Sequence, residues 1–181
     1  MTTTATTTVW TIDQAHSEIG FKVKHMMFTN VSGKFNAFEA RIENEDDNFE
    51  TSKISFSADV NSIDSGNEDR DNHLRSFDFF DVENFPKLQF ESTNIQKISN
   101  DEFKITGDLT IKDVTRSIVL DADFGGLMKD PWGNTKVGLA LKGKINRKDF
   151  GLTWNAALET GGVLVGEDIK LISEIQFLKE A

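Results

Sequence analysis

The sequence contains no cysteine and no tyrosine, and only two of its 181 residues are proline. The absence of cysteine excludes disulfides, thiolate metal ligands and cysteine nucleophiles. Basic residues are also scarce: 20 Lys and Arg stand against 30 Asp and Glu, which gives a formal net charge of −10. Because nucleic acids and anionic lipid headgroups bind cationic surfaces, we expect no nucleic-acid partner.

Long apolar runs are absent as well. No segment of about 18 consecutive apolar residues occurs, so we expect a chain that does not span a membrane. The opening residues, MTTTATTTVW, lack the basic and apolar stretches of a signal peptide. This favours a cytoplasmic location, whereas a chain trimmed at its N-terminus would fit a periplasmic one. We expect a disordered Thr-rich tail over residues 1–8 and one domain over residues 9–181.

The chain is dominated by a period-two alternation of apolar and polar residues, which is typical of strands with one buried face. Regular alternation occurs at residues 19–23, 54–60, 103–111, 118–124, 136–145 and 169–177. Two less regular segments, 31–42 and 87–98, also have strand character. Between Phe35 and Phe38 the apolar parity slips, as a bulge or a sharp bend would cause.

One segment departs from this alternation. The run Ser65-Gly66-Asn67-Glu68 has the S-x-x-E spacing of a helix capping box. Leu74, Phe77 and Phe80 then follow at three-residue steps, which is helical spacing. The sequence therefore predicts one short helix near residues 67–76. Turn residues separate the other segments at 43–48, 99–101, 129–134 and Gly161-Gly162.

About eight antiparallel strands and one helix can form a closed up-and-down barrel or a sandwich. Several strands are long and alternate strictly, which favours the barrel because closure removes the sheet edges. A barrel of this size is either filled by its own side chains or hollow enough for one small ligand. The 15 Phe residues fit a Phe-rich core or a dry aromatic cavity, and the sequence alone leaves both open.

The predicted inner faces are almost wholly apolar, so a hollow barrel would hold an apolar ligand. The residues expected to line it share the inward strand parity or the helical stripe: Phe21, Val23, Phe35, Phe56, Leu74, Phe77, Phe80, Phe90, Phe103, Leu109, Leu120, Leu139 and Leu141.

Two groups of polar residues are candidates for binding the polar end of such a ligand. His25 continues the inward parity of its strand, so it is either a buried core histidine or a polar handle inside the barrel. The second group lies on the predicted helix and consists of Arg70, Asn72, His73 and Arg75. It is either a solvated helix face or a ring of donors at the barrel mouth, where arginine suits a phosphate or carboxylate head.

Known catalytic motifs are missing. The sequence lacks H-E-x-x-H, G-x-S-x-G, a P-loop and a dinucleotide-binding fingerprint. We therefore expect no catalytic residue, no metal site and no cofactor. One alternative stays open, in which His25 and a nearby carboxylate perform general acid–base chemistry on a bound lipid.

Four segments, in order along the chain, resemble motifs of the YceI-like family. The longest is RDNHLRSFDFFDVENFPKLQFES at residues 70–92. The others are WTIDQAHSEIGFKVKH at 10–25, GDLTIKDVTRSIVLD at 107–121 and NRKDFGL at 146–152. Two residues depart from the family's pattern in an expected turn: Asp113 stands where Gly is frequent, and Ser117 where Pro is common.

The resemblance implies a lipocalin-like antiparallel barrel that holds a polyisoprenoid or similar amphipathic chain without catalysis. The expected partner is an isoprenoid or fatty-acid-like small molecule, bound for carriage, storage or sequestration. Two alternatives stay open: an enzyme that acts on a prenyl lipid within the barrel, and a protein-interaction barrel with a filled core. Apolar residues expected on outer faces, such as Val119 and Ile172, would permit a homodimer.

Overall fold

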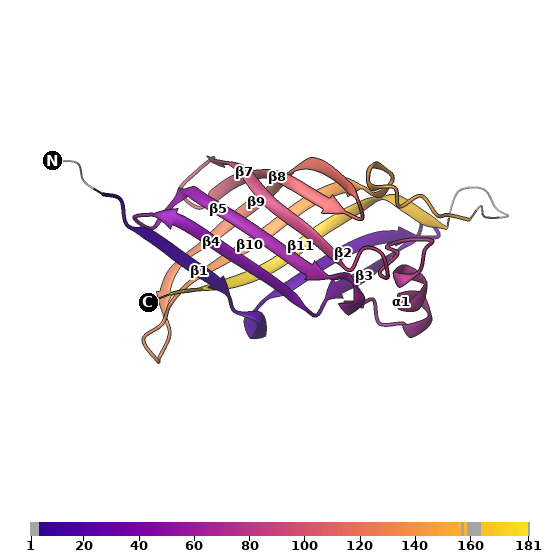
Figure 1. The fold of residues 1–181 in the computed structure, drawn as a ribbon, viewed down its shortest axis with the longest axis horizontal. Helices are drawn as coiled ribbons and strands as arrows, with labels where there is room; N and C mark the ends of the chain where they lie inside the picture. The colour runs from indigo at the N-terminus through magenta and orange to yellow at the C-terminus, as the bar shows by residue number, and fades with distance from the viewer. Residues whose placement is uncertain (1–3, 157, 159–163, 181) are drawn as a thin grey trace.

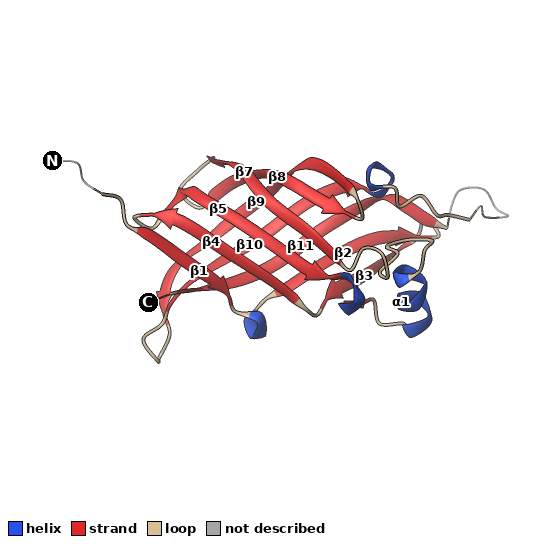
Figure 2. Cartoon of the chain, in the orientation of Figure 1, coloured by secondary structure: helices blue, strands red, loops and turns tan. Residues whose placement is uncertain are grey.

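The computed structural model describes residues 4–156, 158 and 164–180. These residues form one antiparallel sheet that closes into a barrel, with the helix α1 at one end (Figures 1 and 2). The strands are β1 (Thr7–Ile12), β2 (Glu18–His25), β3 (Thr29–Phe35), β4 (Phe38–Glu45), β5 (Asn48–Asp59), β6 (Ile63–Asp64), β7 (Lys87–Lys97), β8 (Glu102–Ile111), β9 (Val114–Lys129), β10 (Thr135–Asn146) and β11 (Val165–Lys179). The helical elements are α1 (Glu68–Arg75) and the 3₁₀ turns η1 (Gln14–His16), η2 (Val60–Ser62) and η3 (Arg147–Phe150).

Eleven strands fill eight positions around the barrel, because three positions are each built from two strands in succession. β11 pairs with β1 near one end of the barrel and with β2 near the other, which closes the sheet. In the same way β3 and β4 share the next position, beside β2 and β1. β5 and β6 share the third. The predicted closed antiparallel barrel is therefore confirmed.

The breaks in these three positions lie side by side and are hydrogen-bonded to one another. The backbone N–H of Asn36 donates to the Ser62 carbonyl at 3.2 Å, and that of Ala37 donates to the Ser62 hydroxyl at 3.0 Å. The Gln14 side-chain amide donates to the Phe38 carbonyl at 2.7 Å. The parity slip between Phe35 and Phe38 is thus a sharp bend that divides the expected single strand into β3 and β4.

The barrel is filled at the end that holds the start of β1 and the end of β11 (Figure 1). Phe49, Phe103 and Phe124 form an aromatic cluster there, with the ring centroids of Phe49 and Phe103 4.8 Å apart. Beside them the buried Trp10 indole donates to the Asn44 side chain, which donates in turn to the Ser52 hydroxyl. These side chains close this end of the interior, and we call them the aromatic plug.

The helix α1 lies where the sequence predicts it, although its N-terminal cap differs. Asn67 is the capping residue, and its side-chain oxygen accepts from the Arg70 backbone N–H at 2.9 Å. Ser65 does not cap the helix; its hydroxyl donates to the buried Asp71 carboxylate instead. The S-x-x-E spacing therefore identified the correct region but the wrong cap.

The ordered sheet begins earlier than expected. Thr7 and Thr8, assigned above to a disordered tail, are the first residues of β1 and pair with Glu45 and Asn44 of β4. Cross-strand hydrogen bonds hold them there, and the Thr6 N–H also donates to Asp46. Gly161-Gly162 lies outside the described residues. In the part of the chain that the structure describes, no helix has the length and hydropathy needed to cross a membrane.

Candidate functional site

A cavity of about 520 Å³ occupies the half of the barrel between the aromatic plug and α1. Its wall is apolar because alternate residues of each strand point inward, as on β2, where Ile19, Phe21 and Val23 line it. Ile105 and Phe177, both buried, line it together with side chains from the other strands. Asp69 of α1 is exposed and also lines the cavity, so the cavity reaches the surface at the helix end.

Three inward-facing glycines keep this half of the barrel hollow. Each lies under a large cavity-lining side chain of the neighbouring strand, which packs flat against the wall instead of across the interior. The pairs are Gly33 with Phe21, Gly107 with Phe90 and Gly143 with Leu120. A Cβ built at Gly33 would lie 2.9 Å from Phe21 Cε1, and one at Gly143 would lie 2.6 Å from Leu120 Cδ2. Any side chain at these positions would therefore push its partner into the cavity.

The substitution Gly107→Ala is expected to lower the free energy of unfolding by about 2 kcal/mol. The new Cβ would lie 2.5 Å from the Glu91 carbonyl oxygen and would also meet the Phe90 ring, so backbone and ring must both shift. Gly138→Ala in β10 is the matched control, since a Cβ there has no neighbour within 4 Å. Urea unfolding of both variants measures the difference; equal stabilities would contradict this packing.

The end of the cavity at α1 is covered by apolar side chains of the helix and of the segment that follows it. Leu74 points into the cavity, as do Phe79 and Phe80. Phe77 does not: it is 80% exposed, and the prediction that it lines the cavity is wrong. The helix ends at Arg75, and the Phe80 N–H bonds to the Leu74 carbonyl in a tight turn, so helical spacing does not extend to Phe77.

Most of the other predicted lining residues do border the cavity. They are Phe21, Val23, Phe35, Phe56, Phe90, Leu109, Leu120, Leu139 and Leu141. Phe103 points inward but belongs to the aromatic plug, so it lies outside the cavity wall. Strand parity distinguishes inside from outside, but it does not tell the filled half of a barrel from the hollow half. That these residues bind a ligand stays a prediction.

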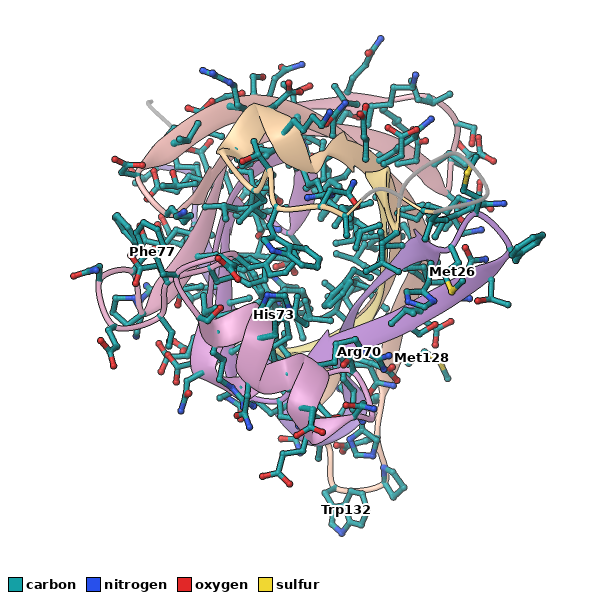
Figure 3. The ribbon with its side chains drawn as sticks, turned by 90° about the vertical axis from the view of Figure 1, so that its right-hand side faces the viewer. Met26, Arg70, His73, Phe77, Met128 and Trp132 are labelled. Atoms are coloured by element: carbon teal, nitrogen blue, oxygen red, sulfur yellow. The ribbon has the colours of Figure 1, made fainter. Side chains whose placement is uncertain are left out.

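Three of the predicted polar residues meet at the helix end of the cavity: His25 from β2, and Arg70 and His73 from α1. Arg70 is held by Ser65, because its Nε donates to the Ser65 hydroxyl at 2.8 Å and its Nη2 to the Ser65 carbonyl at 2.6 Å. Ser65 is bound in turn by Asp71. The guanidinium is therefore fixed in orientation at the cavity edge, where it is partly exposed (Figure 3).

Asn72 and Arg75 lie outside the cavity, contrary to the prediction that they bind a polar head. Arg75 donates to the carbonyl oxygens of Asn61 and Ile63, each at 3.0 Å, and to the Asn72 side chain at 3.0 Å. These bonds attach α1 to η2 and β6. The sequence of a helix does not show which of its polar side chains bind a neighbouring strand. It therefore could not distinguish the structural role of Arg75 from the position of Arg70 at the cavity.

His73 connects the helix to the opposite side of the cavity mouth. Its Nε2 lies 2.9 Å from a carboxylate oxygen of Asp78. Its ring packs edge-on against Phe79, at 5.1 Å between centroids, and against Trp154, at 4.6 Å. Because Trp154 follows η3, these contacts join segments that lie on opposite sides of the mouth (Figures 2 and 3).

Arg147 is a site residue that the sequence analysis missed. It lines the cavity and is only 2% exposed. Its guanidinium donates to the carbonyl oxygens of Leu152, Trp154, Val165 and Gly166. Burial lowers the pKa of this guanidinium from its usual value, and the carboxylate of Glu167 acts in the opposite direction. Arg147 thereby fixes the segment that carries Trp154 against β11.

A comparison of the sequence with known families matches the YceI-like domain over residues 10–177. The chain belongs to the YceI-like family. A Staphylococcus aureus relative, UPF0312 protein SA2479, is 40% identical over 171 residues, which cover 94% of this chain and 97% of the relative. The crystal structure of the Campylobacter jejuni YceI protein is 36% identical, covers 93% of this chain and 96% of its own, and superposes with a TM-score of 0.74.

A structure with much lower sequence identity also matches: a polyisoprenoid binding domain from Saccharophagus degradans that is implicated in plant cell wall breakdown. It is 10% identical, and the match covers 94% of this chain and 98% of that domain, with a TM-score of 0.69. At this identity the likeness concerns the fold.

Two of the four segments that resemble the YceI-like family lie at the helix end of the cavity. The longest, residues 70–92, carries most of α1, the covering phenylalanines and the first half of β7. The segment 146–152 carries Arg147. The two departures lie at the same end of the barrel, in and after the turn between β8 and β9, near η3 (Figure 1). Asp113 is in that turn, whereas Ser117 lies within β9 and not in the turn where we had expected it. Neither lines the cavity.

Two features of the described residues bear on metal binding and on acid–base chemistry by His25. Among the described residues, no three His, Asp or Glu side chains are grouped as metal ligands would be. His25 takes part in none of the ion pairs found there. What the site offers is a long apolar surface with cationic and aromatic groups at one end.

Proposed function

We propose that this YceI-like barrel binds one amphipathic lipid chain, a polyisoprenoid or a similar molecule, and does not transform it. The observation that carries the proposal is the cavity itself, which is apolar along its wall except for Ser173 and has its charged lining groups at the helix end. Burial of an apolar chain is favourable by about 25 cal/mol per Å² and does not depend on the direction of the chain. The wall therefore supplies affinity, and the polar end supplies orientation.

The polar end suits an anionic or hydroxylated head. Arg70 is bound through Nε and Nη2 and presents the rest of its guanidinium to the cavity edge, beside His73. A charge-assisted hydrogen bond contributes roughly 1.5–3 kcal/mol, which is enough to select one end of the ligand. The fold shared with a polyisoprenoid binding domain supports the same ligand class.

The filled-core alternative does not fit this structure, because the interior holds a cavity of about 520 Å³. For the enzyme alternative, we find no observation that favours it over binding. Carriage, storage or sequestration of the lipid follows from a binding site of this kind. A cytoplasmic location and a homodimer stay predictions; Val119 of β9 and Ile172 of β11 are exposed on the outer face, as a dimer contact would require.

The substitution Arg70→Ala is expected to weaken binding of farnesyl phosphate by roughly tenfold or more and to leave binding of farnesol almost unchanged. The reason is that only the phosphate gains the charge-assisted bond. Isothermal titration of both ligands measures the effect, and Arg116→Ala, which removes an exposed cation of β9, is the matched control. If Arg70→Ala changes both affinities equally, or neither, Arg70 only holds Ser65 and the head binds elsewhere.

A further inference from the structure

Four large apolar side chains are exposed around the cavity mouth and do not line the cavity. Met26, Met27 and Phe28 form the turn between β2 and β3 and are 42%, 60% and 86% exposed. Phe77, 80% exposed, follows α1. Figure 3, which looks at this end of the barrel, places Phe77 and Met26 on opposite sides, with His73 and Arg70 between them. We call these four residues the apolar rim.

The turn between β2 and β3 presents its methionines in a conformation that does not suit them. Met26 has φ 51° and Met27 has φ 65°, left-handed values that favour Gly and Asn and are unusual for methionine. The turn is held in place, because the Phe28 N–H donates to the His25 carbonyl and the Met26 N–H to the Leu164 carbonyl. Exposed methionines at strained positions add nothing to the stability of the barrel, which points to a role in binding.

We propose that the apolar rim inserts into the surface of a lipid bilayer with uncharged or zwitterionic headgroups, so that the cavity mouth faces the membrane. The proposal rests on the proposed function in one respect: a long apolar ligand resides in membranes, and it must enter and leave through this mouth. Separate side chains on two projecting loops fit a fluid bilayer, which adapts to them, better than the surface of a protein, which would have to match their spacing.

The charge distribution selects the type of bilayer. The protein carries a net charge of −10, and acidic residues stand next to the rim, namely Glu68 and Asp69 at the start of α1 and Asp78 beside Phe77. Cations, among them Lys24 and Arg70, also lie at this end, so the net charge of the whole protein, and not the local charge of the rim, opposes binding to an anionic membrane. Binding should therefore depend on apolar insertion, weaken when phosphatidylglycerol is added to phosphatidylcholine vesicles, and change little with salt on phosphatidylcholine alone.

The test compares two double variants for binding to phosphatidylcholine vesicles by flotation. Phe28→Asp with Phe77→Asp removes the aromatic part of the rim, and we expect vesicle partitioning to fall by about tenfold or more. The matched control is Met128→Asp with Trp132→Asp, because Trp132, 82% exposed, and Met128 lie at the turn between β9 and β10, at the opposite end of the barrel. This control should bind as the unmodified protein does.

Three results would overturn the proposal: no binding of the unmodified protein to vesicles, equal binding of the rim variant, or loss of binding in the control variant. If the apolar rim binds a protein partner instead of a bilayer, the unmodified protein should not bind vesicles, which is the first of these results. Titration with farnesol in the absence of vesicles separates this proposal from the proposed function, because the rim residues lie outside the cavity and the rim variant should keep its farnesol affinity. Farnesol binding without vesicle binding refutes the rim alone; failure of the unmodified protein to bind farnesol refutes the cavity's role.

Discussion

Replacing Leu141 by tryptophan is expected to weaken prenyl-lipid binding at least about 100-fold while the barrel stays folded. Leu141 lies in the middle of β10 and points into the hollow half of the barrel. An indole there would occupy space that the ligand chain needs. Displacing three or four methylene groups of the chain, at about 0.8 kcal/mol each, accounts for the loss. The cavity has room for the indole, so the fold should tolerate it.

The matched control is Lys142→Trp, which introduces the same side chain at the next residue of the same strand, on the exposed outer face. Farnesol titrations of the two variants, with circular dichroism to verify folding, separate loss of cavity volume from a general effect of tryptophan. Unchanged farnesol affinity in a folded Leu141→Trp protein would show that the ligand does not enter the barrel. Equal losses in both variants would point to the outer surface.

The substitution Arg147→Ala is expected to lower the free energy of unfolding by about 3 kcal/mol. The guanidinium is buried and donates to the carbonyl oxygens of Leu152, Trp154, Val165 and Gly166. Its removal leaves carbonyls in an apolar surrounding without a donor, which costs roughly 1–3 kcal/mol for each group that water does not reach. The Trp154 segment should then be attached to β11 mainly through the hydrogen bonds between Asn155 and Val165, and its contact with His73 should loosen.

Urea unfolding measures this loss, with Lys148→Ala as the control. Lys148 is the next residue and forms a half-exposed ion pair with Glu167, so its removal should have little effect. Arg147→Lys should fall between the unmodified protein and Arg147→Ala, because a lysine keeps the charge but reaches fewer carbonyls. If Arg147→Ala unfolds at the same urea concentration as Lys148→Ala, the carbonyl cluster is not held by this residue.

Strand parity made most of the barrel predictable. With a period of two, each strand residue faces either the barrel interior or the solvent. On β10 the exposed Lys142 and Lys144 mark the solvent face. The same alternation placed Phe21, Phe56 and Leu120 on the inner face. The bend after Phe35 was also visible, since it shifts the parity by one residue. The helix could be located from its spacing, although the capping-box spacing pointed to Ser65 whereas Asn67 caps the helix.

The rest depended on contacts between segments that are distant in sequence. Phe103 and Phe90 have the same pattern, and only the positions of Phe49 and Phe124 place the first in the aromatic plug. Phe77 was misplaced because we extended the helical spacing from Leu74 beyond the predicted end of the helix. The structural role of Arg147 depends on carbonyls up to 19 residues away, so the segment NRKDFGL drew attention to this region without showing what the guanidinium binds.

Native mass spectrometry of the protein purified without detergent tests the central claim, that the hollow half of the barrel holds a lipid chain. The sample is incubated with farnesol after purification, so that an empty barrel can still be filled. We predict one apolar adduct per chain, either carried through purification or gained from farnesol, and no adduct on Leu141→Trp. An unmodified protein that acquires no adduct, or a Leu141→Trp protein that carries as much as the unmodified one, would contradict the account.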